Sequence, residues 1–344
     1  MKRLVVVTQH VDPTHPALAA TVPKLRALAS RVDELVVLAG GEVPGTLPPN
    51  CRVRVFAAAT RAGRGLKFER ALAAEIRGAD AVLAHMCPIY AVLAAPLARP
   101  LRVPLLLWYT QWHASTTLRL AERVSTAVLS VDASSFPLPT RKLVAIGHGI
   151  DAGEFPCAPT PPEGPLRLIA LGRYSPSKGY ETILRGLRGA LDKGIDVTLA
   201  VHGPASNEAE ERHRRELELL AADLALARRL ELGGPLLRPA AAAALAASHA
   251  LVSATVAGAA DKVIIEAALS CVPTIVPSHA FPALVPAALA FDPAVPGSLA
   301  ERIEAFSRLD AVERARLGGE LRQGALAAHT VESWADAVVR SASA

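Results

Sequence analysis

The fold is decided by "LRLIALGRYSPSKGYETILRGL", residues 166–187, where an apolar run leads through a polar loop into a helix. The run at 166–171 has the length and composition of a buried strand, and residues 180–187 repeat apolar side chains at helical spacing. The loop between them contains glycine and proline and carries Arg173 and Lys178, five positions apart. A strand, a short loop and a helix in this order predict a βαβ unit on a parallel sheet.

The same alternation of apolar runs and helical stretches fills both halves of the chain. In the first half the strand candidates are residues 3–8, 33–39, 52–57, 80–85, 103–110 and 126–131, separated by stretches such as 18–30 and 68–78 with helical spacing. In the second half they are residues 166–172, 196–203, 228–234, 249–255 and 272–277. This pattern predicts an α/β protein of two Rossmann-like, doubly wound domains that face a central cleft.

The predicted domains are separated by "DAGEFPCAPTPPEGP", residues 151–165, which contains five prolines and no periodic pattern. Such a composition is typical of a semi-rigid linker. We therefore expect an N-terminal domain over residues 1–155 and a C-terminal domain over residues 164–327.

The composition argues against a membrane-spanning or exported protein. The chain has 344 residues, of which 51% are hydrophobic, but no apolar run approaches the roughly 20 residues that span a bilayer. Lys2 and Arg3 lead directly into a strand, without the pattern of an export signal. The cysteines are scattered at Cys51, Cys87, Cys157 and Cys271 and show no metal-site or disulfide-framework spacing, so we expect reduced thiols in a cytoplasmic protein.

The charge balance favours anionic partners but not nucleic acid. The net charge is +5 and the pI is about 9.2. The cations are spread along the chain, and aromatic residues make up only 4% of it. Nucleic-acid proteins typically cluster their basic residues and interleave stacking aromatics, so we expect no nucleic-acid partner.

Arg173 and Lys178 follow the carboxyl end of a predicted strand, which is the edge where ligands bind in open α/β sheets. The start of the next helix adds partial positive charge there, so the loop favours a diphosphate. From these residues alone, two solvated surface cations remain an alternative. The loop is not a G-x-x-x-x-G-K-[ST] sequence, and no G-x-G-x-x-G follows the first strand of either half, which argues against kinases and dinucleotide dehydrogenases.

Further stretches follow in a characteristic order: "HGP" at 202–204, "LGGP" at 232–235 and "GAADKVIIEAALSCVPTIVP" at 258–277. Together with the loop of Arg173, they resemble the nucleotide-sugar-binding domain of family 4 glycosyltransferases, which have the GT-B fold. "WYTQWHASTTLRLAERV" at 108–124 and "GHGID" at 147–151 are similar to segments of the same family. "VESWADAVVR" at 331–340 resembles its terminal helix, which implies that residues 328–344 cross back to the first domain.

The resemblance implies a retaining glycosyltransferase that moves a sugar from a nucleotide-diphosphate donor to a hydroxyl acceptor. A UDP-sugar is the donor that the family uses most, and a GDP-sugar is the other option. No cofactor and no metal are expected, since the sequence contains no D-x-D motif. Two alternatives remain: a sugar-nucleotide epimerase of similar fold, and a non-catalytic nucleotide-sugar binder.

The resemblance also assigns roles to individual residues. Arg173 and Lys178 are expected to stabilise the negative charge of the departing diphosphate, and His113 to approach the sugar or the β-phosphate. Glu266 is expected to bind the ribose hydroxyls, although an ordinary helix-start carboxylate is the alternative. The remaining expected donor-binding residues are Gly172, Gly203, Pro204, Asp261, Lys262 and Val263.

One departure from the family concerns the donor sugar. The family motif is E-x7-E, and Gly258 occupies its first position. We expect the Asp261 carboxylate to bind a sugar hydroxyl instead, while the amides of Lys262 and Val263 face donor oxygens. The effect of Gly258 on sugar binding is left open.

The acceptor is not defined by the sequence. His10, Asp12, His85, Trp108 and Tyr109 lie at predicted strand ends and are candidates for an acceptor pocket, although the two aromatics fit a core equally well. The candidate acceptors are a small hydroxylated metabolite, a growing glycan and a lipid-linked sugar. The basic helix at 66–78 would suit peripheral contact with an anionic inner membrane face, or it is plain solvated surface.

Overall fold

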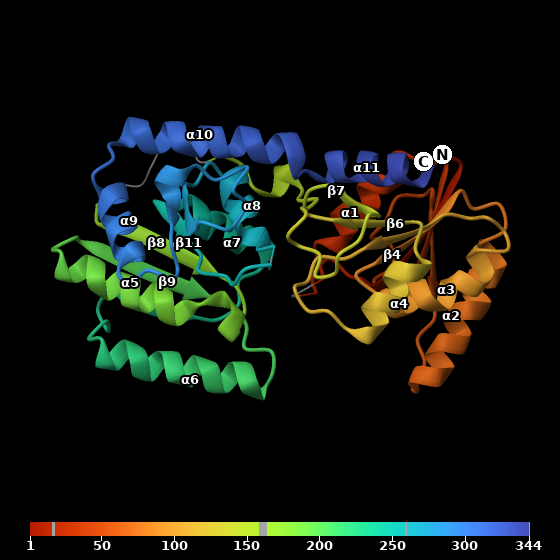
Figure 1. Cartoon of the computed structure of the whole chain (residues 1–344), viewed down its shortest axis with the longest axis horizontal. Helices are drawn as coiled ribbons and strands as arrows, with labels where there is room; N and C mark the ends of the chain where they lie inside the picture. Colours follow the sequence, from red (N-terminus) through yellow and green to blue (C-terminus); the bar gives the residue numbers. More distant parts are fainter. Residues whose placement is uncertain (16–17, 158–163, 259, 344) are drawn as a thin grey trace. The chain divides into compact units, whose positions relative to one another are not determined.

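The structure is a computed structural model that describes residues 1–15, 18–157, 164–258 and 260–343 (Figure 1). It divides into two compact units. Unit 1 comprises Met1–Asp151 and Ala328–Ala344, and unit 2 comprises Ala152–Ala327. The first boundary therefore falls at Asp151 instead of residue 155. Residues 158–163 of the expected linker lie outside the described residues.

Unit 1 is built on a parallel sheet with the strand order β3-β2-β1-β4-β5-β6-β7. The strands are β1 (Arg3–Val11), β2 (Glu34–Glu42), β3 (Cys51–Val55), β4 (Ala81–His85), β5 (Leu105–Trp108), β6 (Ala127–Ser130) and β7 (Leu143–Ala145). The central strands β1, β2 and β4 are apolar and buried because helices cover both faces of the sheet.

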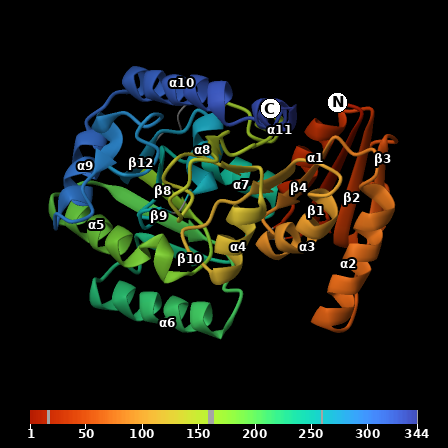
Figure 2. The same cartoon turned by 45° about the vertical axis from the view of Figure 1, so that its right-hand side comes forward.

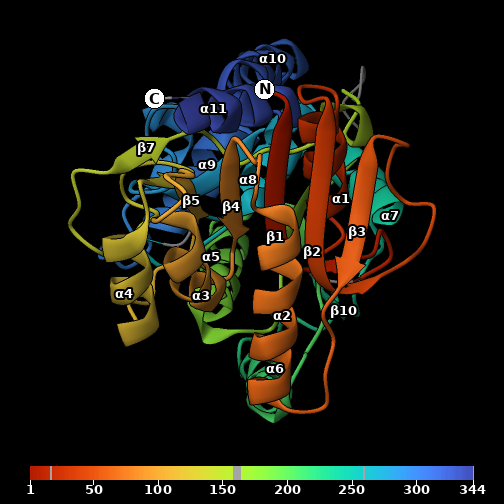
Figure 3. The same ribbon diagram turned by 90° about the vertical axis from the view of Figure 1, so that its right-hand side faces the viewer.

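The helices of unit 1 are α1 (Thr21–Ala29), α2 (Arg61–Glu75), α3 (Pro88–Ala98), α4 (Thr116–Val124) and α11 (Val331–Ser343). α2, α3 and α4 pack side by side on one face of the sheet, with α2 in front of the strands in Figures 2 and 3. α11 packs against α1 and contacts β5, so the end of the chain belongs to the core of unit 1.

Unit 2 repeats the arrangement with the parallel strand order β10-β9-β8-β11-β12-β13. Its strands are β8 (Leu166–Leu171), β9 (Val197–His202), β10 (Leu230–Gly233), β11 (Ala250–Val252), β12 (Thr274–Pro277) and β13 (Ala290–Phe291). Its helices are α5 (Tyr180–Asp192), α6 (Glu208–Asp223), α7 (Arg238–Ala246), α8 (Lys262–Leu269), α9 (Ser298–Ser307) and α10 (Ala311–Ala328, whose last residue belongs to unit 1), with single 3₁₀ turns η1 (Ala152–Glu154), η2 (Pro176–Lys178) and η3 (Ala287–Leu289).

In each sheet the strand order reverses at one point, between β1 and β4 in unit 1 and between β8 and β11 in unit 2. At such a switch point, the loops after the two neighbouring strands lead to opposite faces and leave a crevice for ligands. In unit 2 these loops are residues 172–179, after β8, and residues 253–261, after β11. The expected loop of Arg173 and Lys178 is therefore at the switch point.

The doubly wound α/β prediction is confirmed, and each predicted strand has a counterpart in a sheet. Two short strands at sheet edges, β7 and β13, were not predicted from the sequence. Three and two residues are too few to show a hydrophobic period. None of the described helices is long and apolar enough to cross a membrane.

The expectation of four reduced thiols is wrong for one pair. Cys157 and Cys271 form a disulfide across 114 residues of chain, while Cys51 and Cys87 are free. Sequence spacing did not reveal the pair because its members meet only through the fold: Cys157 lies just after η1, and Cys271 follows the last turn of α8. The disulfide fixes the entry of the chain into unit 2 to the end of α8.

Candidate functional site

The candidate site lies at the carboxyl edge of the unit 2 sheet, where the loops after β8, β9 and β11 are joined by their backbones. Gly172 N–H donates to His202 O, and Tyr174 N–H donates to Pro204 O, each at 3.0 Å. Across the switch point, Val256 N–H donates to Ser177 O at 3.0 Å. These bonds hold the three loops in one arrangement.

Glycine is required where two of these loops touch. A Cβ atom on Gly203 would lie 1.7 Å from the carbonyl oxygen of Gly172. A Cβ atom on Gly172, whose φ is +150°, would lie 2.6 Å from Cε of Lys178. Gly172 and Gly203, both expected at the site, therefore let the β8 and β9 loops approach and let the Lys178 side chain pass over the backbone.

Arg173 is held by the carboxylate of Glu210, which was not among the residues expected at the site. Its Nη1 donates to Oε1 of Glu210 at 2.7 Å, while the Arg173 side chain stays 56% exposed. Glu210 is buried in the first turn of α6, and its Oε2 accepts a hydrogen bond from the Ser206 amide at 2.7 Å. Glu210 thus connects the β9 loop to Arg173.

Lys178 is held from the other side of the switch point. Its Nζ lies 2.7 Å from Oδ1 of Asp261, and the Asp261 side chain is only 3% exposed. Oδ2 of Asp261 accepts hydrogen bonds from Thr255 Oγ1 at 2.6 Å and Ser253 Oγ at 3.1 Å. Lys178 itself is 20% exposed at its side chain.

The charge state of Asp261 follows from these contacts. Burial raises the pKa of its carboxyl. The Lys178 charge and the hydrogen bonds from Lys178, Thr255 and Ser253 lower the pKa, and together they outweigh the effect of burial. The net pKa lies below the ordinary value, so Asp261 is ionised at neutral pH.

Glu266 lies in α8 with a buried side chain and two cationic partners. Its Oε1 accepts hydrogen bonds from Lys262 Nζ at 3.0 Å and Arg238 Nη1 at 3.3 Å. Arg238 also donates from Nε to Glu154 at 2.7 Å. Within the described parts of the chain, Oε2 of Glu266 accepts no hydrogen bond from another group of the protein.

The expected donor residues thus gather around the ends of β8, β9 and β11. Pro204 is fixed by its backbone bond to Tyr174, Lys262 is the first residue of α8, and Val263 follows with a buried side chain. The site also contains three residues that were not expected from the sequence: Glu210, Arg238 and Glu154. The only sequence signal for Glu210 was its place three residues after Asn207, the residue that caps α6.

The corresponding edge of unit 1 is occupied by a buried cluster. Trp108 is fully buried and packs edge-to-face on Trp334, with ring centroids 5.6 Å apart. The Lys24 ammonium lies 5.3 Å from the Trp108 ring and 5.5 Å from the Trp334 ring, within cation–π range. His85 is buried in the same cluster, and burial, with a smaller contribution from the Lys24 charge, lowers its pKa well below the ordinary value.

The other expected residues of unit 1 differ in exposure. Tyr109 is buried, and its single hydroxyl proton has two acceptors within reach, Oε1 of Gln111 at 3.3 Å and the His113 carbonyl at 3.2 Å. The burial of Trp108 and Tyr109 favours their assignment to the core. His10 and His113 are exposed, and Asp12 is partly exposed and accepts hydrogen bonds from the Thr14 amide and hydroxyl, which lower the pKa of its carboxyl.

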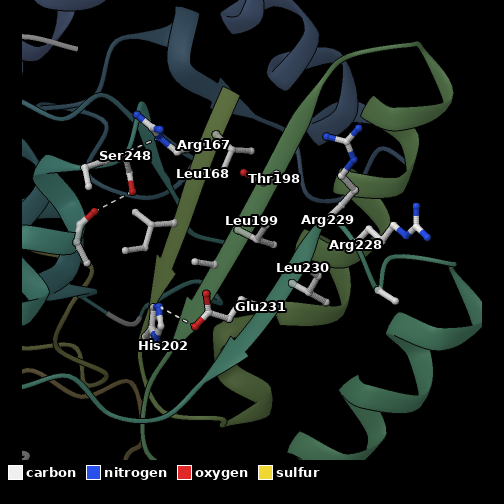
Figure 4. Close-up of a pocket in the computed structure, with 15 residues that line it drawn as sticks. Arg167, Leu168, Thr198, Leu199, His202, Arg228, Arg229, Leu230, Glu231 and Ser248 are labelled. Atoms are coloured by element: carbon white, nitrogen blue, oxygen red, sulfur yellow. Dashed lines mark hydrogen bonds and ion pairs between the residues drawn. The ribbon is translucent and has the colours of Figure 1, made fainter. Parts of the chain in front are cut away.

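A pocket of about 420 Å³ lies elsewhere in unit 2, between strands β8 to β10 and helix α7 (Figure 4). Its lining includes none of the expected donor residues. Two of its three arginines are turned to groups of the protein itself: Arg167 donates to Ala247 O at 3.1 Å, and Arg229 pairs with Asp196. This pocket is separate from the loops of Arg173 and Lys178.

Comparisons with solved structures define the fold class. HepE from Anabaena, in a complex with UDP-glucose, aligns with a TM-score of 0.78 and 17% identity over 100% of both chains. A glycosyltransferase from Rickettsia africae aligns with a TM-score of 0.78 and 13% identity over 99% of this chain and 97% of its own. Sucrose-phosphate synthase from Thermosynechococcus elongatus aligns with a TM-score of 0.75 and 17% identity over 99% and 98%.

The chain therefore has the GT-B fold, as the sequence predicted. No protein-family model and no curated protein sequence matches it. The likeness at these identities concerns the fold, so the activity has to be argued from the residues of the site.

Proposed function

We propose that the chain is a retaining glycosyltransferase that transfers a sugar from a UDP-sugar to a hydroxyl acceptor without a metal. The observation that carries this proposal is the pair Arg173 and Lys178 on the loop at the switch point of unit 2. Each has a buried carboxylate partner that orients it, and the sheet edge there is the usual ligand edge of a doubly wound domain.

The donor's diphosphate would meet three sources of positive charge. Arg173 has five N–H donors, of which Nη1 is engaged by Glu210, and its side chain is exposed. Lys178 adds an ammonium, and the first amides of α8, at Lys262 and Val263, add the partial charge of a helix start. Oε2 of Glu266 would accept a hydrogen bond from a ribose hydroxyl. The UDP and UDP-glucose present in the HepE structures support uracil as the base of the donor.

In the proposed reaction, the bond between the anomeric carbon and the β-phosphate oxygen breaks and a bond to the acceptor oxygen forms on the same face. The acceptor hydroxyl proton passes to the departing phosphate oxygen. Negative charge grows on the diphosphate in the transition state, where Arg173 and Lys178 stabilise it. His113 is proposed to contact the sugar or the β-phosphate.

Calorimetric titration with UDP, GDP, dTDP and NAD tests the donor site. We expect the native chain to bind UDP, and Arg173→Ala to lose at least tenfold in affinity, since a charge-assisted hydrogen bond contributes about 1.5–3 kcal/mol. Arg228→Ala, an exposed arginine that lines the pocket of Figure 4, is the matched control and should bind as the native chain does. Binding of NAD alone, or of none of the four, would overturn the proposal.

Transfer is tested separately from binding. Release of UDP from a UDP-sugar should depend on an acceptor and persist in excess EDTA. Acceptor-independent interconversion of UDP-sugars would identify the epimerase alternative. Tight binding with no turnover would identify the non-catalytic binder, which the glycine at position 258 also fits.

The acceptor determines whether a membrane takes part. The proposal implies a cytoplasmic location, where nucleotide sugars are made. If the acceptor is lipid-linked, α2 is the candidate contact: Arg61, Arg64, Lys67 and Arg70 are exposed, and Leu66 is 50% exposed. Flotation with vesicles of anionic or neutral lipid separates the alternatives, since a soluble acceptor requires no binding to either.

A further inference from the structure

The ion pair of Lys178 and Asp261 spans the switch point of unit 2. Lys178 belongs to the loop after β8, and Asp261 ends the loop after β11, 83 residues later in the sequence. β8 and β11 are neighbours whose following helices pack on opposite faces, so the pair lies at the switch point, where doubly wound sheets bind their ligands. The residue at 261 thus decides which charge borders the proposed phosphate site.

Asp261 occupies the N-cap position of α8 but does not cap the helix. Within the described residues, no first-turn amide of α8 donates to its side chain. Both carboxylate oxygens instead face Lys178, Ser253 and Thr255. An aspartate at an N-cap usually accepts hydrogen bonds from these amides, so its inward orientation leaves the amides of Lys262 and Val263 for a ligand anion, while the Ile264 amide donates to the Asp261 carbonyl at 3.1 Å.

The contacts of Asp261 leave little for a sugar. Its side chain is 3% exposed, and Oδ1 and Oδ2 each have a partner within 2.7 Å. A sugar hydroxyl would have to displace Lys178 from Oδ1 or Thr255 from Oδ2. The carboxylate is held by the protein itself from two sides.

The Lys178 side chain is flexible and needs a fixed partner to hold its ammonium in place. A lysine side chain has four rotatable bonds, and fixing them costs about 2 kcal/mol of conformational entropy. Its stem already passes over Gly172, where a Cβ would lie 3.0 Å from Nζ. The 2.7 Å contact with Asp261 fixes the ammonium in the absence of a ligand, and two further N–H donors remain for phosphate oxygens.

We propose that Asp261 is a positioning residue that holds the Lys178 ammonium at the donor diphosphate, and not a ligand of the donor sugar. This inference rests on the proposed function and deepens it. It replaces the expectation from the sequence that Asp261 binds a sugar hydroxyl. It also gives a reason why a carboxylate is tolerated beside an anion site: its charge is compensated by Lys178.

The test separates phosphate from sugar by titrating UDP and UDP-glucose into the native chain, Asp261→Asn, Lys178→Met and the double variant. For Asp261→Asn we expect both ligands to bind more weakly by the same factor, about tenfold, since a charge-assisted contact to phosphate loses its geometry. In the Lys178→Met background, Asp261→Asn should cause no further loss. Asp196→Asn, at the opposite end of the sheet, is the control and should change neither affinity.

Three results would overturn the inference: weaker binding of UDP-glucose alone, unchanged or tighter binding of UDP, or an equal loss from Asp261→Asn with and without Lys178. If the native chain binds no nucleoside diphosphate, the proposed function itself fails, so the two failures are distinguishable.

A second variant covers the case in which Asp261→Asn does not fold. Thr255→Val removes the hydrogen bond to Oδ2 and keeps both charges and the side-chain shape. We expect it to weaken UDP and UDP-glucose equally by a few-fold. No change in either affinity, with the melting temperature preserved, would also overturn the inference.

Discussion

Replacing Gly203 by alanine should disrupt the donor site through the backbone alone. The new Cβ would lie 1.7 Å from the carbonyl oxygen of Gly172, whereas contacts of a Cβ below 3.0 Å are essentially never found. The loops after β8 and β9 must therefore separate by about 1.3 Å or more. The hydrogen bonds of Gly172 to His202 and of Tyr174 to Pro204 cross this contact and would weaken.

The expected cost is a loss of about 3 kcal/mol in the free energy of unfolding. It combines overpacking strain of about 1–3 kcal/mol with two backbone hydrogen bonds of about 1 kcal/mol each, only partly lost. Binding should suffer more than stability suggests. Arg173 follows Gly172 directly, and a displacement of about 1 Å in a positioned group can cost about 100-fold in activity.

Gly234→Ala is the matched control for Gly203→Ala. Both glycines precede a proline in the turn after a strand, but a Cβ on Gly234 meets nothing within 4 Å. Denaturant unfolding followed by far-ultraviolet circular dichroism gives the stability, and UDP titration gives the binding. All three tryptophans belong to unit 1, so their fluorescence checks that unit 1 is unaffected. If Gly203→Ala unfolds and binds UDP as Gly234→Ala does, the close approach of the two loops does not require glycine at position 203.

Three further predictions concern other contacts. Glu210→Gln should lower kcat more than it raises KM for the donor, since the Arg173 guanidinium loses its charged partner but stays exposed. Burial lowers the pKa of His329 to about 4. Because the unfolded imidazole, with a pKa of about 6.5, then binds more protons, the free energy of unfolding should fall as the pH drops from about 6.5 to 4, by about 2 kcal/mol at pH 5. Reducing the disulfide of Cys157 and Cys271 should destabilise unit 2 by about 2–4 kcal/mol.

Each of these has a direct control. Glu208→Gln changes the neighbouring exposed acid of α6 and should leave kcat unchanged; an equal effect would contradict the role of Glu210. His329→Gln should flatten the stability profile between pH 6.5 and 4, and an unchanged slope would assign it to other groups. Alkylation of the wild-type protein, unfolded in denaturant without a reductant, should label two of the four cysteines. Four labels would show that the disulfide does not form.

The architecture could be predicted because it depends on local patterns. Buried parallel strands are continuous apolar runs, and the helices between them repeat at 3.6 residues, so strand positions follow from the sequence. β7 and β13 were not predicted because edge strands of two or three residues are too short to show a hydrophobic period. The pairing of Cys157 with Cys271 escaped because it depends on where α8 ends in space, which no spacing of cysteines encodes.

Of the site, the sequence identified cations more readily than their partners. Arg173 and Lys178 lie together on one loop, and their setting between a strand and a helix is visible in the sequence. Glu210 lies 37 residues from Arg173, and Asp261 lies 83 residues from Lys178. No local sequence pattern connects a carboxylate at the start of a later helix with a cation this far away along the chain.

The strand order supplies the missing connection. In a doubly wound sheet, the first strand is flanked by the second and the fourth, so the loop after β8 must face the loops after β9 and β11. Acids at the starts of the helices that follow those two strands are therefore the groups within reach of cations on the first loop. Glu210, in the first turn of α6, and Asp261, just before α8, occupy these places. Once a sequence predicts the doubly wound order, counter-ions should be sought at those two helix starts, however distant they are along the chain.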